Sequence, residues 1–244
     1  MSGRRRDRDA VDIAGDYQAR ALDSPRAAQR FWHRAKIRLL DRIASAEPTD
    51  RIADAGCGSG VIAAHLAHRA AEVVGFDSNP AAVSFAAAHW QRPNLRFVLG
   101  PFEAMVPEGP FDRICCLEVI EHLYEEQVIE ALRIFATAAR PGATLFLTTP
   151  NARSAWPAIE WTLDRLGLVP TLDEAQHLTW FTRRRLASAC EAAGWRVDDL
   201  GTFNGLAPFL AVVGDSVGLA AERLEFRTRR LLPWNLIYCL ARRT

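Results

Sequence analysis

Short apolar runs alternate with longer amphipathic stretches along most of the 244 residues. A run of five to eight largely apolar residues bounded by turn-forming residues is typical of a buried strand, and apolar positions at spacings of three and four are typical of a helix. The runs that predict strands are 51–55, 72–77, 95–99, 113–117, 144–149, 195–202 and 235–241. Because helical patterns separate most of them, apart from the loop-rich stretch 100–112, we predict an α/β fold with a mostly parallel sheet and helices on both faces.

Three segments do not fit this alternation. Residues 16–48 have apolar positions at helical spacing, which predicts one or two helices before the first strand. The insertion 151–181 follows the fifth strand and carries Trp156, Trp161, Leu163 and Leu166 at roughly helical spacing. Since ligands bind at the carboxyl ends of parallel strands, we expect this insertion to be a helical lid over the substrate. Residues 206–232 predict one long helix before the last strand.

Composition indicates one large domain, 16–244, behind a basic tail at 1–15 that we expect to be disordered. The formal net charge of +1 does not favour a nucleic-acid partner. The five cysteines are an odd number without paired CxxC spacing, which indicates reduced thiols. No secretory signal or membrane-spanning run is evident, since the longest apolar stretch, 209–221, is broken by Asp215. We therefore expect a cytoplasmic protein.

The first strand runs into a glycine-rich turn that precedes a helix. The segment from Asp54 to Gly60 reads Asp-Ala-Gly-Cys-Gly-Ser-Gly, so its glycines are Gly56, Gly58 and Gly60. Glycines let the backbone approach a ligand that a side chain would exclude. NAD enzymes use GxGxxG, whereas here the third glycine comes two residues after the second. Asp77 ends the second strand, where a carboxylate can accept hydrogen bonds from the ribose hydroxyls of an adenosyl group. The alternative is that Asp77 or Asn79 caps the following helix.

Two glutamates and a histidine follow the fourth strand. Glu118, Glu121 and His122 stand at i, i+3 and i+4, so a helical turn would place them on one face toward the cofactor end of the sheet. Two carboxylates and an imidazole suit Mg, Mn or Fe better than a structural zinc site. The alternative is a metal-free site in which His122 or His177 is the general base, and the simplest reading is that the glutamates only favour the helix dipole.

These motifs together resemble the class I S-adenosylmethionine-dependent methyltransferases. The segments 116–123 and 148–151 resemble the ubiquinone-biosynthesis O-methyltransferases and the enzymes that methylate the terminal 2′-hydroxyl of small RNAs. The resemblance implies a Rossmann-like seven-stranded sheet whose last strand is antiparallel. It also implies S-adenosylmethionine over Asp54 and the glycine turn, with a backbone contact from Leu117.

Further site residues follow from this resemblance. Proline at position 101 replaces the acid that binds adenine in many methyltransferases, so we expect Phe102 to contact the ring instead. The resemblance implies metal binding by Glu118, Glu121 and His122, and the RNA group adds His177 through the stretch 176–182. Lys36 matches a cofactor-contacting arginine of the quinone group, but lysine lacks the bidentate fork and is not assigned to the site.

The resemblance leads to three functional hypotheses. The first is O-methylation of a small phenol, quinol or lipid-like acceptor, with Glu118, His122 and His177 as catalytic residues. The second is 2′-O-methylation at the 3′ end of small RNAs, which the absence of an RNA-binding motif disfavours. The third is a non-catalytic domain that binds S-adenosylmethionine. Apolar residues and arginines in 208–232 also predict peripheral membrane contact, against the simpler reading of a core-packing helix.

Overall fold

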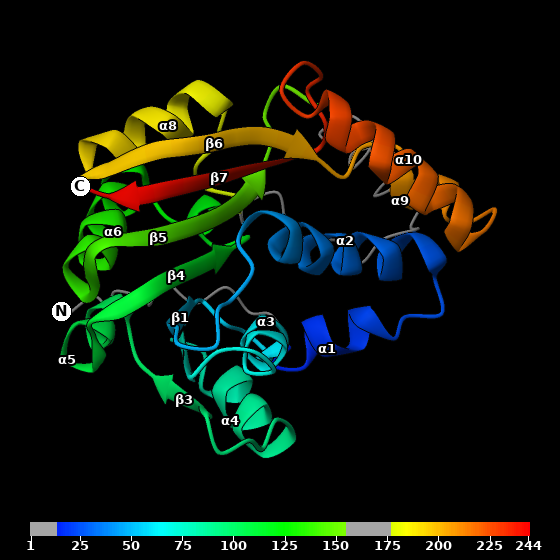
Figure 1. Ribbon diagram of the computed structural model, residues 1–244. Helices are drawn as coiled ribbons and strands as arrows, with labels where there is room; N and C mark the ends of the chain where they lie inside the picture. Colours follow the sequence, from blue (N-terminus) through cyan, green and yellow to red (C-terminus); the bar gives the residue numbers. More distant parts are fainter. Residues whose placement is uncertain (1–13, 155–176) are drawn as a thin grey trace, which may run out of the picture.

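The computed structural model describes residues 14–154 and 177–244 (Figure 1). Its sheet has seven strands in the order β3-β2-β1-β4-β5-β7-β6, and β7 is antiparallel to both of its neighbours. The strands are β1 (Arg51–Ala55), β2 (Glu72–Asp77), β3 (Leu95–Leu99), β4 (Phe111–Leu117), β5 (Ala139–Pro150), β6 (Trp195–Phe203) and β7 (Leu236–Arg243). The predicted fold class is confirmed.

Helices cover both faces of the sheet (Figure 1). They are α1 (Tyr17–Leu22), α2 (Ala27–Ile43), α3 (Val61–Leu66), α4 (Pro80–His89), α5 (Met105–Glu108), α6 (Glu125–Ala138), α8 (Arg183–Ala192), α9 (Ala207–Leu210) and α10 (Asp215–Thr228), with one-turn 3-10 helices η1 (Phe102–Ala104) and η2 (Ile120–His122). One core cluster joins α6 and α8 to the sheet, for example through Phe135 and Leu186. The other joins α2 and α3 to the opposite face, for example through Leu40 and Leu66. Apolar residues at helical spacing therefore bury one stripe of each of these helices.

The chain before the first strand forms two helices, within the range that its pattern predicts. Helix α2 buries Phe31, Ala35 and Leu39 at spacings of four, as the apolar periodicity requires. Pro25 lies between α1 and α2, where a residue without a backbone N–H donor favours a break.

The prediction of one continuous helix over 206–232 is wrong. The chain forms the short helix α9, turns through Val212 and Val213, and then forms α10. The cause is a buried carboxylate on α10, since Glu225 accepts hydrogen bonds from the backbone N–H groups of Gly205, Leu206 and Ala207 at 2.6–2.9 Å. These bonds satisfy the first donors of α9 and fold it back against α10.

Two predicted segments fall largely outside the described residues. The basic tail at 1–15 overlaps residues 1–13, and the lid at 151–181 overlaps residues 155–176. Within the described ranges, none of the helices has both the length and the apolar character needed to cross a bilayer.

Candidate cofactor pocket and Glu-His cluster

The glycine turn lies where β1 ends and α3 begins. Gly56 and Gly60 have φ angles of 72° and 78°, a conformation that other residues rarely adopt. A side chain would also be excluded by contact, because a Cβ atom on Gly56 would lie 2.5 Å from Val119 Cγ2, and one on Gly60 would lie 2.7 Å from Phe97 Cζ. The backbone N–H groups of Gly56 and Cys57 both donate to the carbonyl of Phe76. The turn is thus fixed against the neighbouring strand β2.

The carboxylate that ends β2 supports the same turn. Asp77 Oδ2 accepts a hydrogen bond of 2.7 Å from the backbone N–H of Gly58, and its Oδ1 accepts one of 2.8 Å from Asn79. The helix-capping role belongs to Asn79, whose side chain accepts from the N–H groups of Ala81 and Ala82 at the start of α4. Asp77 is only partly buried and therefore stays accessible to a ligand at the strand ends.

The acid that precedes the turn is buried. Asp54 is 2% exposed, and within the described residues its Oδ2 has no hydrogen-bond partner. Burial, with a smaller contribution from the negative charge of Asp77, raises the pKa of Asp54 to about 7. Buried polar atoms in native proteins nearly always have partners, so an unpartnered oxygen beside a pocket indicates a place for a ligand's donor group.

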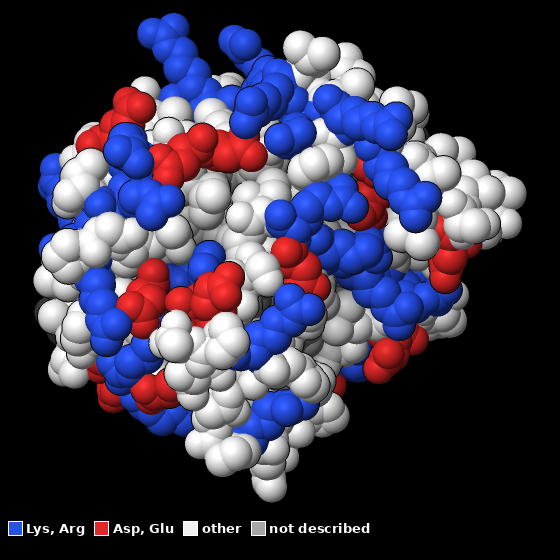
Figure 2. All heavy atoms as spheres, viewed as in Figure 1, with Lys and Arg blue, Asp and Glu red and all other residues white. Residues whose placement is uncertain are grey.

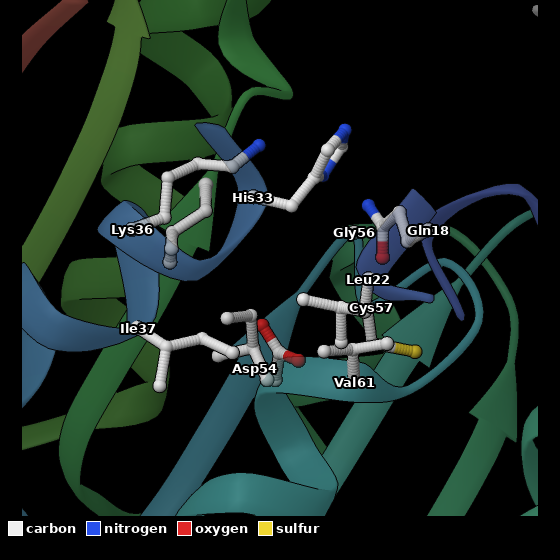
Figure 3. A pocket seen from close by; sticks show the side chains of 11 residues that line it. Gln18, Leu22, His33, Lys36, Ile37, Asp54, Gly56, Cys57 and Val61 are labelled. Atoms are coloured by element: carbon white, nitrogen blue, oxygen red, sulfur yellow. The ribbon is translucent and has the colours of Figure 1, made fainter. Parts of the chain in front are cut away.

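A small pocket that opens to solvent lies between the glycine turn and the two N-terminal helices (Figure 3). Its sheet side includes Asp54, Gly56 and Leu117, as predicted for a cofactor site. Helix α1 is attached to the turn by the N–H of Ala19, which donates to Ser59 Oγ at 3.0 Å. Helices α1 and α2 therefore cover the cofactor end of the sheet.

Three polar side chains on the helical side of this pocket were not assigned to the site from the sequence. Gln18 comes from α1, and His33 and Lys36 come from α2 (Figure 3). Burial and the charge of Lys36 lower the pKa of His33 to about 3, so this imidazole is neutral at physiological pH. Lys36 alone had a usable signal, its match to an arginine of the quinone group, and the structure places it in the pocket.

The segment after β4 differs from the predicted helical turn. Glu118 adopts a left-handed conformation with φ of 57°, and only η2, a single 3-10 turn, follows it. Its backbone N–H donates to the carbonyl of Thr148, and its Oε1 accepts 2.8 Å from Thr148 Oγ1. Glu118 is therefore held against β5 and does not share a helical face with Glu121 and His122. The expected i, i+3, i+4 geometry is wrong because the bonds to β5 override local helix formation.

Three of the four predicted metal ligands do meet. One ligand atom each of Glu121, His122 and His177 lies within 4.8 Å of the other two, and Glu118 is not part of this group. The imidazole centroids of His122 and His177 are 5.3 Å apart. We call Glu121, His122 and His177 the Glu-His cluster.

Backbone bonds bring the two parts of this cluster together. The N–H groups of Leu178 and Thr179 donate to the carbonyl of Glu121 at 2.8 and 3.0 Å. Thr179 Oγ1 donates to the carbonyl of Leu123. These bonds fix His177 beside His122 although more than fifty residues separate the two along the chain.

Burial controls the charge of the Glu-His cluster. Burial first, and the neighbouring Glu118 second, raise the pKa of Glu121 well above its usual range. Burial and His122 lower the pKa of His177 to about 4. Glu121 Oε2 accepts 3.0 Å from Thr149 Oγ1. A neutral imidazole beside a buried carboxyl group can accept a proton or ligate a cation.

The Glu-His cluster adjoins the pocket. Leu117 lines the pocket one residue before Glu118, and Val119 packs against Gly56. Lys36 also lines the pocket, and its positive charge acts on Glu121. Phe102 lies in η1 after β3, partly buried, with its ring 5.2 Å edge-on from that of Phe135. The arrangement offers one binding pocket with a polar cluster beside it.

The residues 26–200 match the family of the methyltransferase domain. The chain belongs to this family. Since the match includes the glycine turn, the pocket side of α2 and the Glu-His cluster, the protein is an S-adenosylmethionine-dependent methyltransferase.

Individual relatives agree. A protein of Mycolicibacterium smegmatis described as a probable S-adenosylmethionine-dependent methyltransferase is 28% identical over 217 residues, which cover 86% of this chain and 76% of the relative. The ubiquinone biosynthesis O-methyltransferase of Stutzerimonas stutzeri is 34% identical over 105 residues, which cover 41% of this chain and 44% of the relative. The chain therefore matches less than half of that enzyme.

Comparison with solved structures agrees with this fold. The crystal structure of magnesium protoporphyrin IX methyltransferase from Synechocystis PCC 6803 with bound SAH superposes with a TM-score of 0.65 at 16% identity, covering 97% of this chain and 98% of that one. At this identity the likeness shows the fold alone.

Proposed function

We propose that this methyltransferase methylates the oxygen of a small hydroxylated acceptor, of the phenol, quinol or lipid-like class. The observation that carries the proposal is the position of the Glu-His cluster beside the pocket, whose lining residue Lys36 is close enough for its charge to act on Glu121. A hydroxyl must lose its proton on methylation, and proton acceptors beside the donor pocket can assist that loss.

Residues of the pocket suit the methyl donor, as do Asp77 and Phe102, which lie outside its lining. S-adenosylmethionine carries an ammonium group, ribose hydroxyls and an activated sulfonium methyl group. The unpartnered Oδ2 of Asp54 suits the ammonium group, and Asp77 suits the hydroxyls. The glycine turn leaves room for backbone approach, and Phe102 offers an aromatic face or edge for adenine. The protein's main contribution is then to hold donor and acceptor in line.

His122 and His177 are the proposed proton acceptors for the acceptor hydroxyl. The two rings lie close together, and the lowered pKa of His177 leaves its imidazole unprotonated, with a free nitrogen that can accept a proton as a weaker base than ordinary histidine. Glu118 fixes the backbone at the end of β4 and places its charge beside Glu121. We therefore propose that Glu118 contributes to catalysis through Glu121 and not by contact with the two imidazole rings.

The same donor set could hold a divalent metal. Two imidazoles and a carboxyl group, with one ligand atom each within 4.8 Å of the others, are a donor set that suits Mn or Fe, and Mg less well. Glu121, His122 and His177 would be the ligands, with Glu118 outside the group. Such an ion would lower the pKa of the acceptor hydroxyl.

A methyl-transfer assay tests the proposal. Purified protein is incubated with S-adenosylmethionine labelled in its methyl group and either a lipid extract or small RNA, with and without a chelator. Label in base-stable ether products of the lipid extract supports the proposal. Label in RNA would replace it with the 2′-O-methyltransferase hypothesis, and thermal stabilisation by the donor without any transfer would favour a non-catalytic domain.

Two variants give this assay its control. His177→Ala is expected to abolish most transfer, whereas His68→Ala removes an exposed imidazole that follows α3 and contacts Arg92, and it is expected to leave transfer unchanged. Restoration of activity by Mn after chelation would establish the metal-dependent form. Equal activity of wild type and His177→Ala would contradict the role of the Glu-His cluster.

A further inference from the structure

Helix α10 turns an apolar stripe toward solvent. Val217 and Leu224 are 42% and 61% exposed, and with the exposed Ala220 they share one face of α10; Val213, 79% exposed, lies in the turn that precedes the helix. The inward face of α10 is apolar too, with Leu219, Ala221 and Phe226 packed on the core, and Glu225 is buried there with three backbone hydrogen bonds to its carboxylate. A helix of a globular protein normally has one apolar stripe, turned inward, so the exposed stripe of α10 is additional to that packing.

The stripe continues around the turn from α9. Leu206, Phe209, Leu210 and Val212 are all exposed in the segment that leads into α10. Leu231 extends the stripe after the helix with 78% of its surface exposed. We call these residues, with those of α10, the α9–α10 stripe. So many adjacent exposed apolar side chains indicate a binding surface, because isolated ones are ordinary but contiguous ones are costly.

Arginines accompany the stripe. Arg223, Arg227 and Arg230 follow one another at helical spacing along its edge, and all three are exposed. Arg230 pairs with Asp199, but within the described parts of the chain Arg223 and Arg227 have no acidic partner. Figure 2 shows blue atoms beside the white surface at the right, where α9 and α10 lie in Figure 1.

Acidic groups do not balance these arginines. Glu222 pairs with Arg38 of α2 and is mostly buried, Glu225 is buried, and Asp215 lies at the far end of α10. The surface is therefore apolar along its centre and positive along one edge.

We propose that the α9–α10 stripe docks on an anionic lipid bilayer. Valine and leucine side chains would enter the boundary between headgroups and acyl chains, and Arg223 and Arg227 would meet lipid phosphates. A second copy of the chain fits less well, because a two-fold contact through the stripe would bring the unpaired arginines of both copies together. The highly exposed, outward-facing residues also cannot enclose a small molecule.

Docking there would bring the bilayer close to the cofactor pocket. Gly218 lets α10 approach α2 so closely that a Cβ atom would lie 2.8 Å from Phe31 Cε2. Arg38 pairs with Glu222, and Arg42 lies over the ring of Phe226. Helix α2 therefore packs against α10 and also carries His33 and Lys36, which line the pocket. This part of the inference rests on the proposed function, in which the acceptor is lipophilic.

Sedimentation with vesicles tests the docking surface. The full-length protein is mixed with vesicles of phosphatidylcholine, with or without phosphatidylglycerol, in the absence of methyl donor and acceptor. We expect binding to the anionic vesicles to be about tenfold or more stronger than to the neutral ones. Val213→Asp with Leu224→Asp, and separately Arg223→Glu with Arg227→Glu, should each weaken it by about tenfold or more.

Matched controls are Val106→Asp on α5 and Arg133→Glu on α6, which change exposed residues elsewhere and should bind as wild type does. An unchanged melting temperature establishes that the variants fold. The proposal is overturned if wild type ignores anionic vesicles, if both double variants bind as well as wild type, or if the stripe variants instead abolish a dimer seen in sedimentation equilibrium. Because the assay contains no reaction, its failure is distinct from failure of the proposed methylation.

Discussion

The cofactor pocket and the Glu-His cluster lie side by side but are built differently. The floor of the pocket is the glycine turn, whose seven residues from Asp54 to Gly60 are contiguous in the sequence. The cluster combines Glu121 and His122 from the end of β4 with His177, which backbone bonds to Glu121 hold in place. A contiguous site depends on local backbone conformation, whereas an assembled site depends on tertiary contacts. Substitutions should therefore affect the two regions in different ways.

The largest effect is expected at the glycine turn. Gly56→Ala introduces a Cβ atom at positive φ and against Val119. We expect this variant to lose about 3 kcal/mol or more of folding free energy. We also expect it to show no measurable binding of S-adenosylmethionine. Thermal unfolding and calorimetric titration measure both.

Gly142→Ala is the matched control for Gly56→Ala. Gly142 has a φ of 77°, but nothing lies within 4 Å of its added Cβ atom, so this variant reports backbone strain alone, of about 1 kcal/mol. Equal destabilisation of the two variants would show that contact with Val119 does not matter.

Substitutions in the Glu-His cluster should slow methyl transfer without changing the affinity for the methyl donor. We expect His177→Ala to lower the rate of methyl transfer by about 10²–10⁴-fold while the affinity for S-adenosylmethionine stays within experimental error of wild type. Single-turnover rates and calorimetric titration separate the two quantities. A variant that lost donor binding as well would mean that the two regions are one site energetically.

Asp54 allows a test by pH. Its pKa is raised to about 7 in the folded protein, so the folded state holds a proton that the unfolded state releases near its ordinary value. Without donor, the free energy of unfolding should then fall as pH rises from about 4 to about 7, and level off above the folded pKa.

Asp54→Asn should remove that dependence on pH. The neutral amide needs no proton, so we expect the variant without donor to be the more stable protein above pH 7, while its affinity for S-adenosylmethionine falls by about tenfold. Chemical denaturation across the pH range measures the first effect. An unchanged slope would show that another group causes it.

The smallest effect is expected at Glu118. Glu118→Gln keeps an oxygen that can accept from Thr148 and removes only a charge near Glu121, so methyl transfer should fall by less than about tenfold. Glu121→Gln, by comparison, changes a member of the Glu-His cluster and should cost about a hundredfold. If Glu118→Gln were the more damaging variant, Glu118 would contact the acceptor directly.

The predictions from sequence succeeded where a pattern repeats or is contiguous. The bounds of β1, β2 and β3 agree with the apolar runs, even at β3, which lies at the edge of the sheet and is only partly buried. The same reasoning failed at 206–232, where helical periodicity continues through a turn that Glu225 makes possible. It also failed at Glu118, where bonds to Thr148 replace the expected helical turn.

Residues on other elements could not be predicted from local patterns. Gln18 and His33 belong to helices whose packing over the pocket follows from contacts such as that between Ala19 and Ser59. Nothing in their spacing distinguishes them from ordinary polar positions on an amphipathic helix. The lid expected at 151–181 stays a prediction for residues 155–176, which lie outside the described ranges.

The sequence by itself determined the sheet and the glycine turn, because strand burial and left-handed glycines are local demands on the chain. It also supplied the residues of the Glu-His cluster, though not their geometry. Tertiary structure alone decided that Lys36 lines the pocket, that Glu118 stands apart from the Glu-His cluster, and that α10 turns valine and leucine toward solvent. The reason is physical: which face of a helix is buried depends on what packs against it, and no single segment encodes its neighbour.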